Sequence, residues 1–234
     1  MRKRAIAVTI AFIIVLTLVA WAILGSPGIE QPSSHASHNP AIVDVIKLPR
    51  PTLKGNVSLE EALQKRRSVR EYTGAEVSLS ELSQLLWAAQ GITSPQGLRT
   101  APSAGALYPL EIYAVNATGV YHYNPLNHSL ERIRSTNVQG DLASAALNQN
   151  AVRQAPLKLV ITGVYERTAA KYGDRAERYV HLEAGHAAQN VLLECTASGL
   201  GAVPIGAFDD SKVQDVLGVP TTDLPLYIIP VGHV

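Results

Sequence analysis

The stretch Ala101–Tyr113, APSAGALYPLEIY, decides the expected fold of this 234-residue chain. Residues Ala101–Gly105 carry almost no side-chain bulk and lead directly into a predicted strand, so their backbone can approach a flat ligand closely. Pro102 and Pro109 limit the freedom of the unfolded segment, while Gly105 relaxes the local φ/ψ restriction. An ordinary tight loop before a strand is the alternative interpretation.

The regions around this stretch predict helices and strands in a mixed α+β order. Ser58 with Glu61, and Ser78 with Glu81, have the spacing of capping boxes and predict two helices, the second closed by Gly91 at its C′ position. Pro230 places the last strand near a sheet edge. Apolar runs predict strands at Leu110–Val115, Val120–Tyr123, Ser129–Ile133, Leu157–Val164 and Leu226–Val231, and further helices at Arg178–Ser198 and Asp209–Leu217.

The composition fits one globular domain with an appendage, because 47% of the residues are hydrophobic and 17% are charged. A formal net charge of +1 provides no bulk field that would recruit nucleic acid, so any anion site must be a local cluster. The single cysteine, Cys195, excludes an internal disulfide and is expected to fill the core.

The N-terminus predicts a membrane anchor over residues 1–24. Basic residues at positions 2–4 precede Ala5–Leu24, an uncharged run of 20 residues that as a helix would span about 30 Å, the thickness of a bilayer core. The positive-inside rule then places the following domain outside the cytoplasm. A cleaved signal peptide, which would make the protein secreted, is the alternative. A Pro-, Ser- and Gly-rich linker is expected at 25–50, and the folded domain at 51–234.

The motif RRSVR provides a compact candidate anion site, because Arg66, Arg67 and Arg70 bracket Ser68 where a helix gives way to extended chain. Guanidinium groups bind phosphate through paired hydrogen bonds, and a serine hydroxyl can add another. Alternatively, the cations only complement the negative C-terminal end of the preceding helix.

Four segments together resemble the nitroreductase superfamily, specifically its SagB-type dehydrogenase branch: RRSVREY, APSAGALYPLEIY, HLEAGHAAQNVLLE (His181–Glu194) and GLGAVPIGAF (Gly199–Phe208). The resemblance covers roughly residues 60–231. It implies an α+β fold in which helices flank a central, mainly antiparallel sheet. It also implies a homodimer with FMN at the subunit interface.

The resemblance assigns roles to individual positions. Lys171 and Tyr172 match a Lys-Tyr pair that this branch uses in azoline oxidation, where a Tyr or a Lys of lowered pKa could remove the proton while hydride leaves to the flavin. A solvated lysine beside a half-buried tyrosine is the alternative. The implied cofactor-binding residues are Arg66, Arg67, Ser68 and Arg70 at the phosphate and ribityl chain, and Pro102, Ser103, Ala104, Gly105, Tyr108, Pro204, Ile205 and Gly206 around the ring system.

The substrate and even the activity stay open at this point. The expected small-molecule substrate is an azoline-type heterocycle, or a nitroaromatic or quinone that NAD(P)H reduces. A non-catalytic flavin-binding or electron-relay module at the membrane is the alternative function, and an anion-binding domain without flavin is a third. No metal site is expected at His181, Glu183 and His186, because the two histidines lie five residues apart on a helix and diverge.

Overall fold

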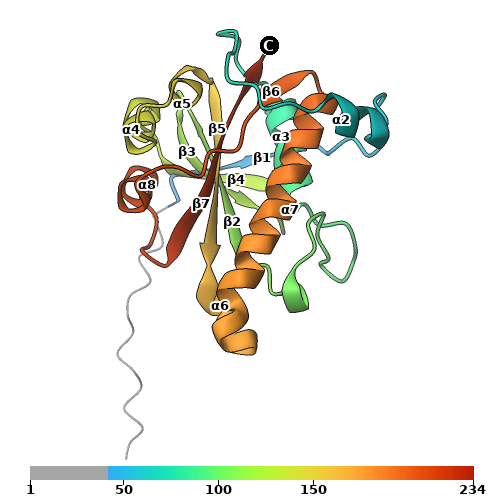
Figure 1. Cartoon of the computed structure of the whole chain (residues 1–234), viewed down its shortest axis with the longest axis vertical. Helices are drawn as coiled ribbons and strands as arrows, with labels where there is room; N and C mark the ends of the chain where they lie inside the picture. Colours follow the sequence, from blue (N-terminus) through green and yellow to red (C-terminus); the bar gives the residue numbers. More distant parts are fainter. Residues whose placement is uncertain (1–41) are drawn as a thin grey trace, which may run out of the picture. The chain divides into compact units, whose positions relative to one another are not determined.

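The computed structural model describes residues 42–234, so the predicted anchor at 5–24 lies outside the described part. Among residues 42–234, none of the helices combines the length and the apolar character needed to cross a bilayer. One sheet of seven strands, in the order β1-β4-β3-β2-β5-β7-β6, forms the centre of the domain, and its neighbouring strands pair antiparallel (Figure 1).

The strands are β1 (Asp44–Lys47), β2 (Leu110–Asn116), β3 (Gly119–Asn124), β4 (Ser129–Arg134), β5 (Leu157–Val164), β6 (Leu200–Ala202) and β7 (Asp223–His233). The helices are α2 (Leu59–Lys65), α3 (Leu79–Gln90), α4 (Gln139–Ala145), α5 (Asn150–Gln154), α6 (Tyr165–Tyr172), α7 (Ala176–Ala197) and α8 (Asp210–Leu217), with 3-10 turns η1 (Ala104–Ala106) and η2 (Gly173–Arg175).

Helices cover both faces of the sheet, as the resemblance implied. α3 and α7 pack on one face, and α4, α5 and α8 pack on the other (Figure 1). The central strands therefore bury both sets of alternating side chains: Leu159 and Ile161 of β5 lie in the α3/α7 core, and Val160 lies in the opposite core. Burial on both faces explains why β5 is a continuous apolar run in the sequence.

Local capping explains why the predicted helices begin where they do. The Ser78 hydroxyl accepts from the Glu81 N–H while the Glu81 carboxylate accepts from the Ser78 N–H, so α3 has the complete capping box. Gly218 ends α8 in the left-handed conformation. Gly91 closes α3, as predicted, but as its C-cap residue and with an extended backbone of φ −65°. Glycine is needed there because a Cβ would lie 2.6 Å from the Trp87 carbonyl oxygen.

The expected linker at 25–50 contains a strand, so the folded part begins before Pro51. β1 pairs with β4 from Asp44 opposite Arg132 to Lys47 opposite Ser129. An ion pair of 3.0 Å joins Asp44 to Arg132, and Leu48 is buried directly after the strand. The linker prediction failed here because a four-residue strand gains its stability from a distant partner strand, which local composition does not reveal.

The last strand is longer than predicted, and it lies near a sheet edge as Pro230 indicated, next to the edge strand β6. β7 lies between β5 and β6, and Pro230 pairs opposite Lys158 of β5. On the other side of β7 the ladder is interrupted, because Ala202 pairs with Val231 and the next bridge joins Ile205 to Ile228. Pro230 falls opposite this interruption, where a residue without an amide hydrogen costs no ladder bond.

Candidate functional site

The predicted site residues form two groups, and the first group lies around β6. Ser68 bridges Ala202 in parallel, and the Val69 N–H donates to the Ala202 carbonyl at 3.0 Å. Gly201 makes this approach possible, because a Cβ on it would lie 2.6 Å from the Val69 side chain. The RRSVR motif is therefore fixed beside the end of β6, from which the chain continues directly into Pro204, Ile205 and Gly206.

The arginines of this motif differ in what they contact. Arg67 donates to the carbonyls of Gln64 and Arg66 at 2.9 and 2.7 Å, which is the helix-end role of the alternative interpretation. Arg70 is exposed, and its shortest bond is a 3.5 Å contact with the Ser68 carbonyl. None of the three arginines forms an ion pair within residues 42–234. Arg66 and Arg70, with the exposed Ser68 hydroxyl, thus keep donors for an anion.

A pocket of ≈ 390 Å³ lies beside this group, lined by Arg70 and Ile205. Sequence reasoning missed the rest of its lining, which includes Gln149, Asn150 and Gln154 at α5. The Gln149 amide donates to the Ala207 carbonyl at 2.8 Å and so ties α5 to the chain after Gly206. Only a short polar run marks these residues in the sequence, and no spacing rule connects them with RRSVR.

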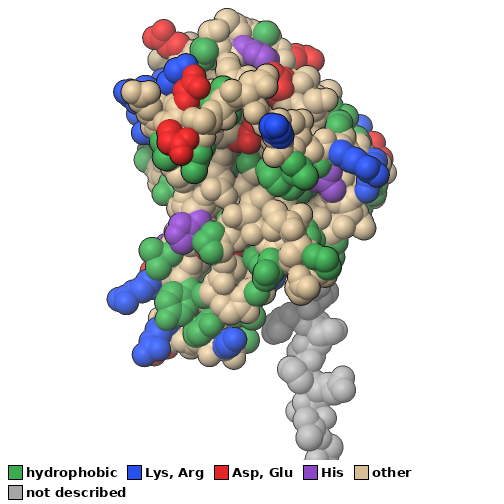
Figure 2. Space-filling view, turned by 90° about the vertical axis from the view of Figure 1, so that its right-hand side faces the viewer, with side chains coloured by type: hydrophobic (Ala, Val, Ile, Leu, Met, Phe, Trp, Pro, Cys, Tyr) green, Lys and Arg blue, Asp and Glu red, His purple; other side chains and the backbone are tan. Residues whose placement is uncertain are grey.

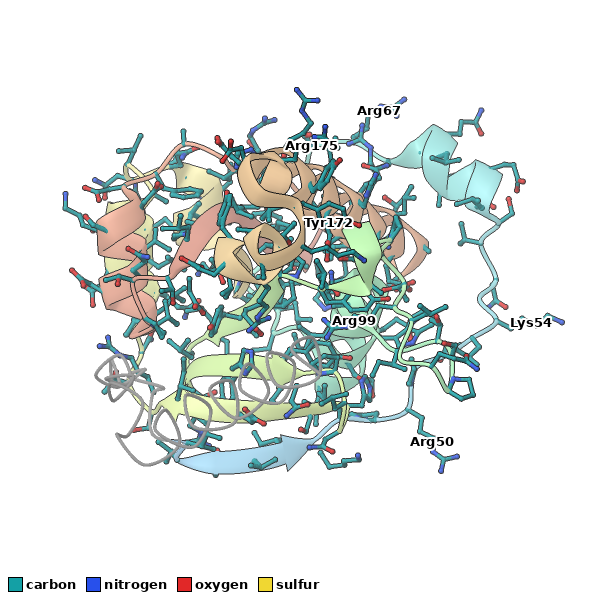
Figure 3. The ribbon with its side chains drawn as sticks, turned by 90° about the horizontal axis from the view of Figure 1, so that it is seen from below. Arg50, Lys54, Arg67, Arg99, Tyr172 and Arg175 are labelled. Carbon is teal, nitrogen blue, oxygen red and sulfur yellow. The ribbon has the colours of Figure 1, made fainter. Side chains whose placement is uncertain are left out.

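The second group brings Lys171 and Tyr172 to the loop of small residues. Gly105 has φ +65°, and a Cβ built on it would lie 2.9 Å from Tyr172 Oη and 3.0 Å from Lys171 Nζ. The rings of Tyr172 and Tyr179 pack perpendicular to each other with centroids 5.0 Å apart, which orients the Tyr172 phenol. Pro102 and Gly105 are exposed beside this pair, while Ser103 and Ala104 are half-buried. Figure 3 shows Tyr172 at this end of the molecule.

Tyr108 holds the loop rather than pointing away from it. Its N–H donates to Ser103 Oγ at 2.9 Å, and its hydroxyl accepts from the Arg99 N–H at 3.1 Å. The Arg99 guanidinium lies 4.3 Å from the centre of the Tyr108 ring, and Arg167 donates to the Tyr108 carbonyl at 3.2 Å. The resemblance identified Tyr108 but gave no hint of Arg99 or Arg167, whose contacts depend on tertiary packing.

The two groups lie at opposite ends of α7 in one chain. α7 has 22 residues, which corresponds to a length of about 33 Å. Its N-terminal end follows α6 and η2, next to Lys171 and Tyr172, and its C-terminal end leads into β6 and the RRSVR motif (Figure 1). One chain therefore does not bring the predicted phosphate ligands together with the predicted catalytic pair.

Comparison with known proteins now gives this architecture a family. The nitroreductase family model matches residues 63–233. This chain belongs to the nitroreductase family. Its members are oxidoreductases that use FMN with NAD(P)H and are typically dimeric.

The relatives within the nitroreductase family differ in their described activities. A Methanocaldococcus jannaschii protein whose name places it among the nitroreductases is 47% identical over 197 residues, covering 81% of this chain and 98% of its own. The microcin B17-processing protein McbC of Escherichia coli is 28% identical, covering 68% and 63%. The NADPH-flavin oxidoreductase of Vibrio harveyi is 32% identical over 113 residues, covering 45% and 47%.

Solved structures share the same fold. A nitroreductase-family crystal structure from Ralstonia eutropha superposes with a TM-score of 0.75 at 31% identity, covering 81% of this chain and 89% of that one. A chain of the E. coli microcin synthetase McbBCD complex gives a TM-score of 0.63 at 23% identity, covering 87% and 82%. These matches confirm the α+β fold with its mainly antiparallel sheet.

Proposed function

We propose that this nitroreductase-family chain is an FMN-dependent oxidoreductase that works as a homodimer and exchanges hydride with a small organic substrate. The observation that carries the proposal is the convergence of Lys171 Nζ and Tyr172 Oη on Gly105, next to exposed backbone of small residues. A group with an exchangeable proton thus lies beside a surface on which a flat ring can rest.

The residues at the other end of α7 fit the phosphate of FMN. Arg66, Arg70 and Ser68 have uncommitted donors, and Gly206 is exposed with nothing within 4 Å of where its Cβ would be, so backbone there is open to a ligand. Bound FMN supplies a hydride donor or acceptor at N5. The chain's contribution is to bind the phosphate with guanidinium groups, to orient the ring with backbone, and to hold or accept a proton at Lys171 Nζ or Tyr172 Oη.

A second copy of the chain would complete each site. Two helices related by a two-fold axis perpendicular to both at their midpoints run antiparallel, so the Lys171 end of one α7 meets the Ser68 end of the other. Gly185 lies near the middle of α7, yet nothing within 4 Å in its own chain requires a glycine there. A mid-helix glycine costs roughly 1 kcal/mol relative to alanine, and close approach by a partner helix explains its use.

The surface beside α7 also suits a partner. Leu182 of α7 is 55% exposed, and Leu59 and Leu63 of α2 are 61% and 53% exposed. A shallow groove of ≈ 480 Å³ between α2, α3 and α7 is lined by Leu59, Trp87 and Leu193. Figure 2 shows this side of the molecule, where hydrophobic side chains form patches between charged ones. Exposed apolar patches of this kind mark interaction surfaces.

For the substrate, we favour oxidation of an azoline-type heterocycle. The Lys171-Tyr172 pair and the similarity to a microcin-processing protein support this class. Reduction of a quinone or nitroaromatic by NAD(P)H is the second candidate, and the similarity to an NADPH-flavin oxidoreductase favours it.

The proposed location is the membrane, through the anchor predicted at residues 5–24. The full chain should stay in the membrane fraction after alkaline carbonate extraction, and release by carbonate would exclude an anchor.

The test of FMN binding is the visible spectrum of the full chain after addition of FMN and desalting. Wild-type protein should retain stoichiometric flavin. The double variant Arg66→Ala, Arg70→Ala should bind FMN at least about tenfold more weakly, because each charge-assisted hydrogen bond contributes about 1.5–3 kcal/mol. Arg50→Ala is the matched control, since Arg50 is an exposed arginine outside both groups. Wild-type protein without flavin would refute the proposal.

Turnover separates an enzyme from a flavin-binding or electron-relay module. Wild-type protein should turn over repeatedly with a thiazoline-containing peptide and oxygen, or with NADPH and a quinone. Lys171→Met and Tyr172→Phe should lose this turnover while they keep FMN. Stoichiometric FMN without multiple turnover of either pair would identify the protein as a binding module, and normal turnover of both variants would remove the two residues from the mechanism.

A further inference from the structure

The helix that carries Lys171 and Tyr172 also carries Arg167, four residues before Lys171. Residues four apart lie on one face of a helix, and both of these side chains reach the loop 102–108. This helix, α6, lies at the end of the sheet where β2 begins (Figure 1). The proposed chemistry at Lys171 and Tyr172 does not use Arg167, so its contacts need another explanation.

The guanidinium of Arg167 joins two other parts of the chain. Its Nη1 donates to the Tyr108 carbonyl at 3.2 Å, and its Nη2 forms an ion pair with Glu111 Oε1. Within residues 42–234, no other donor bonds to the Tyr108 carbonyl. The next carbonyl, that of Pro109, accepts from the Val164 N–H at 2.8 Å at the start of the pairing between β2 and β5. Arg167 therefore holds the last loop carbonyl before this pairing begins.

Glu111 is a fixed partner and not a mobile surface carboxylate. Its side chain is 15% exposed, and its Oε2 lies 2.7 Å from His122 Nε2. His122 Nδ1 lies 3.4 Å from Glu131 Oε2, so the contacts continue across β2, β3 and β4. Burial raises the pKa of Glu111, but the hydrogen bonds and charges of His122 and Arg167 outweigh it and leave the pKa below its ordinary value. The carboxylate therefore stays charged and in place for Arg167.

The contacts of Arg167 exceed those of an isolated ion pair at the surface, which contributes little to stability. The planar guanidinium presents its donors at fixed angles, and here one donor serves the loop while another serves β2. The nearby Asp223 accepts from Tyr113 Oη at 2.7 Å and so has a partner of its own. A movement of α6 away from the loop must therefore break at least one of the two bonds of Arg167.

We propose that Arg167 is a positioning residue that fixes α6 against the loop 102–108 through these two bonds. It thereby keeps the side chains of Lys171 and Tyr172 next to Gly105. The catalytic consequence rests on the proposed function, whereas the effect on the loop and the helix does not. Loss of Arg167 leaves the catalytic pair chemically intact but free to move, and it leaves the phosphate ligands at the opposite end of α7 undisturbed.

A cavity beside Arg167 allows this role to be tested by chemical rescue. The cavity has a volume of ≈ 250 Å³, and its lining includes Arg167, Glu111 and His122. Arg167→Ala enlarges the cavity, so a free guanidinium ion can take the place of the missing group. Methylammonium carries the same charge without the planar set of donors, and it therefore separates the effect of geometry from the effect of charge.

Amide hydrogen exchange of the flavin-free full chain measures how firmly the loop and α6 are held. Arg167→Ala should exchange on the order of tenfold faster than the wild type in Ser103–Tyr108 and in α6. Guanidinium at millimolar concentration, far below the molar range that unfolds proteins, should restore this protection, and methylammonium should not. Arg132→Ala is the matched control and should keep wild-type exchange in both segments, because Arg132 forms its ion pair with Asp44 of the edge strand β1.

Glu111→Gln provides a second, independent variant. It keeps the shape of the side chain but removes the charge that holds the guanidinium, so it should loosen the same two segments. Combining it with Arg167→Ala should add little, since both changes remove one linkage. Guanidinium should not rescue the double variant, because the carboxylate that binds the ion is gone. Protection of Ile228–Val231 in β7 should stay at the wild-type level in every variant, which excludes global unfolding as the cause.

Turnover then connects the loop to the proposed chemistry. At saturating FMN, Arg167→Ala should lower kcat at least about tenfold while flavin retention stays unchanged, and guanidinium should raise kcat again. Wild-type exchange of both segments in Arg167→Ala, or equal rescue by methylammonium, would overturn the inference. Failure of wild-type protein to retain FMN would refute the proposed function alone, because the exchange measurements do not involve flavin.

Discussion

At the scale of single residues, Gly105 combines a left-handed backbone with close neighbours. A Cβ on it would be strained by φ +65° and would lie 2.9 Å from Tyr172 Oη and 3.0 Å from Lys171 Nζ. From the sequence, the small residues of this stretch predicted a backbone that can approach a flat ligand closely. The residues that surround Gly105 could not be predicted, because α6 joins the loop only through tertiary contacts.

Replacing Gly105 with alanine should separate the loop from the catalytic pair. The methyl group forces Lys171 and Tyr172 to move, and the backbone conformation costs about 1–2 kcal/mol more than for glycine. We expect turnover to fall at least about tenfold, since a shift of 1 Å in a catalytic group can cost about a hundredfold. Steady-state kinetics with a thermal melt measures both effects. Gly140→Ala, where a Cβ meets nothing within 4 Å, is the control; equal turnover in both variants would contradict the prediction.

Lys158 should make the stability of the fold depend on pH. It is fully buried in β5, and its ammonium donates to Gln139 Oε1 and to the Ala155 carbonyl, both at 2.6 Å; no carboxylate among residues 42–234 pairs with it. Burial lowers the pKa of Lys158 from 10.5 to about 8. Between these values the unfolded chain binds more protons than the folded chain, so the free energy of unfolding rises with pH through this window.

Lys158→Met should remove this rise. Urea unfolding at pH 7 to 10.5 should show wild-type stability increasing by up to about 3 kcal/mol, whereas the variant changes less and is the more stable of the two near pH 7. Lys54→Met replaces an exposed lysine and should keep the wild-type slope. A slope in Lys158→Met equal to that of the wild type would show that another group is responsible.

At the scale of elements, local capping signals predicted the starts of helices correctly, whereas the pairing of distant strands could not be predicted from the sequence. The caps Ser58, Ser78 and Asp209 were readable because a hydroxyl or carboxylate three residues from its partner amide is a local arrangement. β1 was missed because its partner residues in β4 are 82 to 88 residues away, from Lys47 opposite Ser129 to Asp44 opposite Arg132. The place of β7 near an edge was predicted, but not that Pro230 lies opposite a break in the ladder.

The helix α7 carries the prediction about assembly. If a second α7 crosses at Gly185, Gly185→Arg should shift the protein to monomer, although arginine favours a helix more than glycine by about 0.7 kcal/mol or more. Light scattering after size-exclusion chromatography measures the mass. Gly140→Arg, in α4, should leave the assembly unchanged, because Gly140 lies on the opposite face of the sheet. An unchanged mass for Gly185→Arg would place the crossing elsewhere.

At the scale of the whole molecule, the family, its fold and its cofactor class could be recognised from four short motifs. Glu183 was considered only as a metal ligand, together with His181 and His186, and set aside, because its burial on the inner side of α7 is invisible in a sequence. Likewise, the motifs do not reveal how they are arranged in space. The sequence did not predict that RRSVR and Lys171-Tyr172 lie at opposite ends of a 22-residue helix.

That separation has a genetic consequence. In the proposed dimer every site draws its phosphate ligands from one copy and Lys171 from the other. At a flavin concentration too low to fill the weakened site, a chain with Arg66→Ala and Arg70→Ala is inactive alone, and so is a chain with Lys171→Met. When the two chains are co-expressed, they form heterodimers. One site of a heterodimer carries both substitutions, and the other site contains only wild-type residues. Two dead alleles should therefore complement each other, restoring about a quarter of the wild-type sites under random pairing. As a control, one chain carries both sets of substitutions and its partner carries one of them. Neither site of that heterodimer is intact, so activity should not be restored.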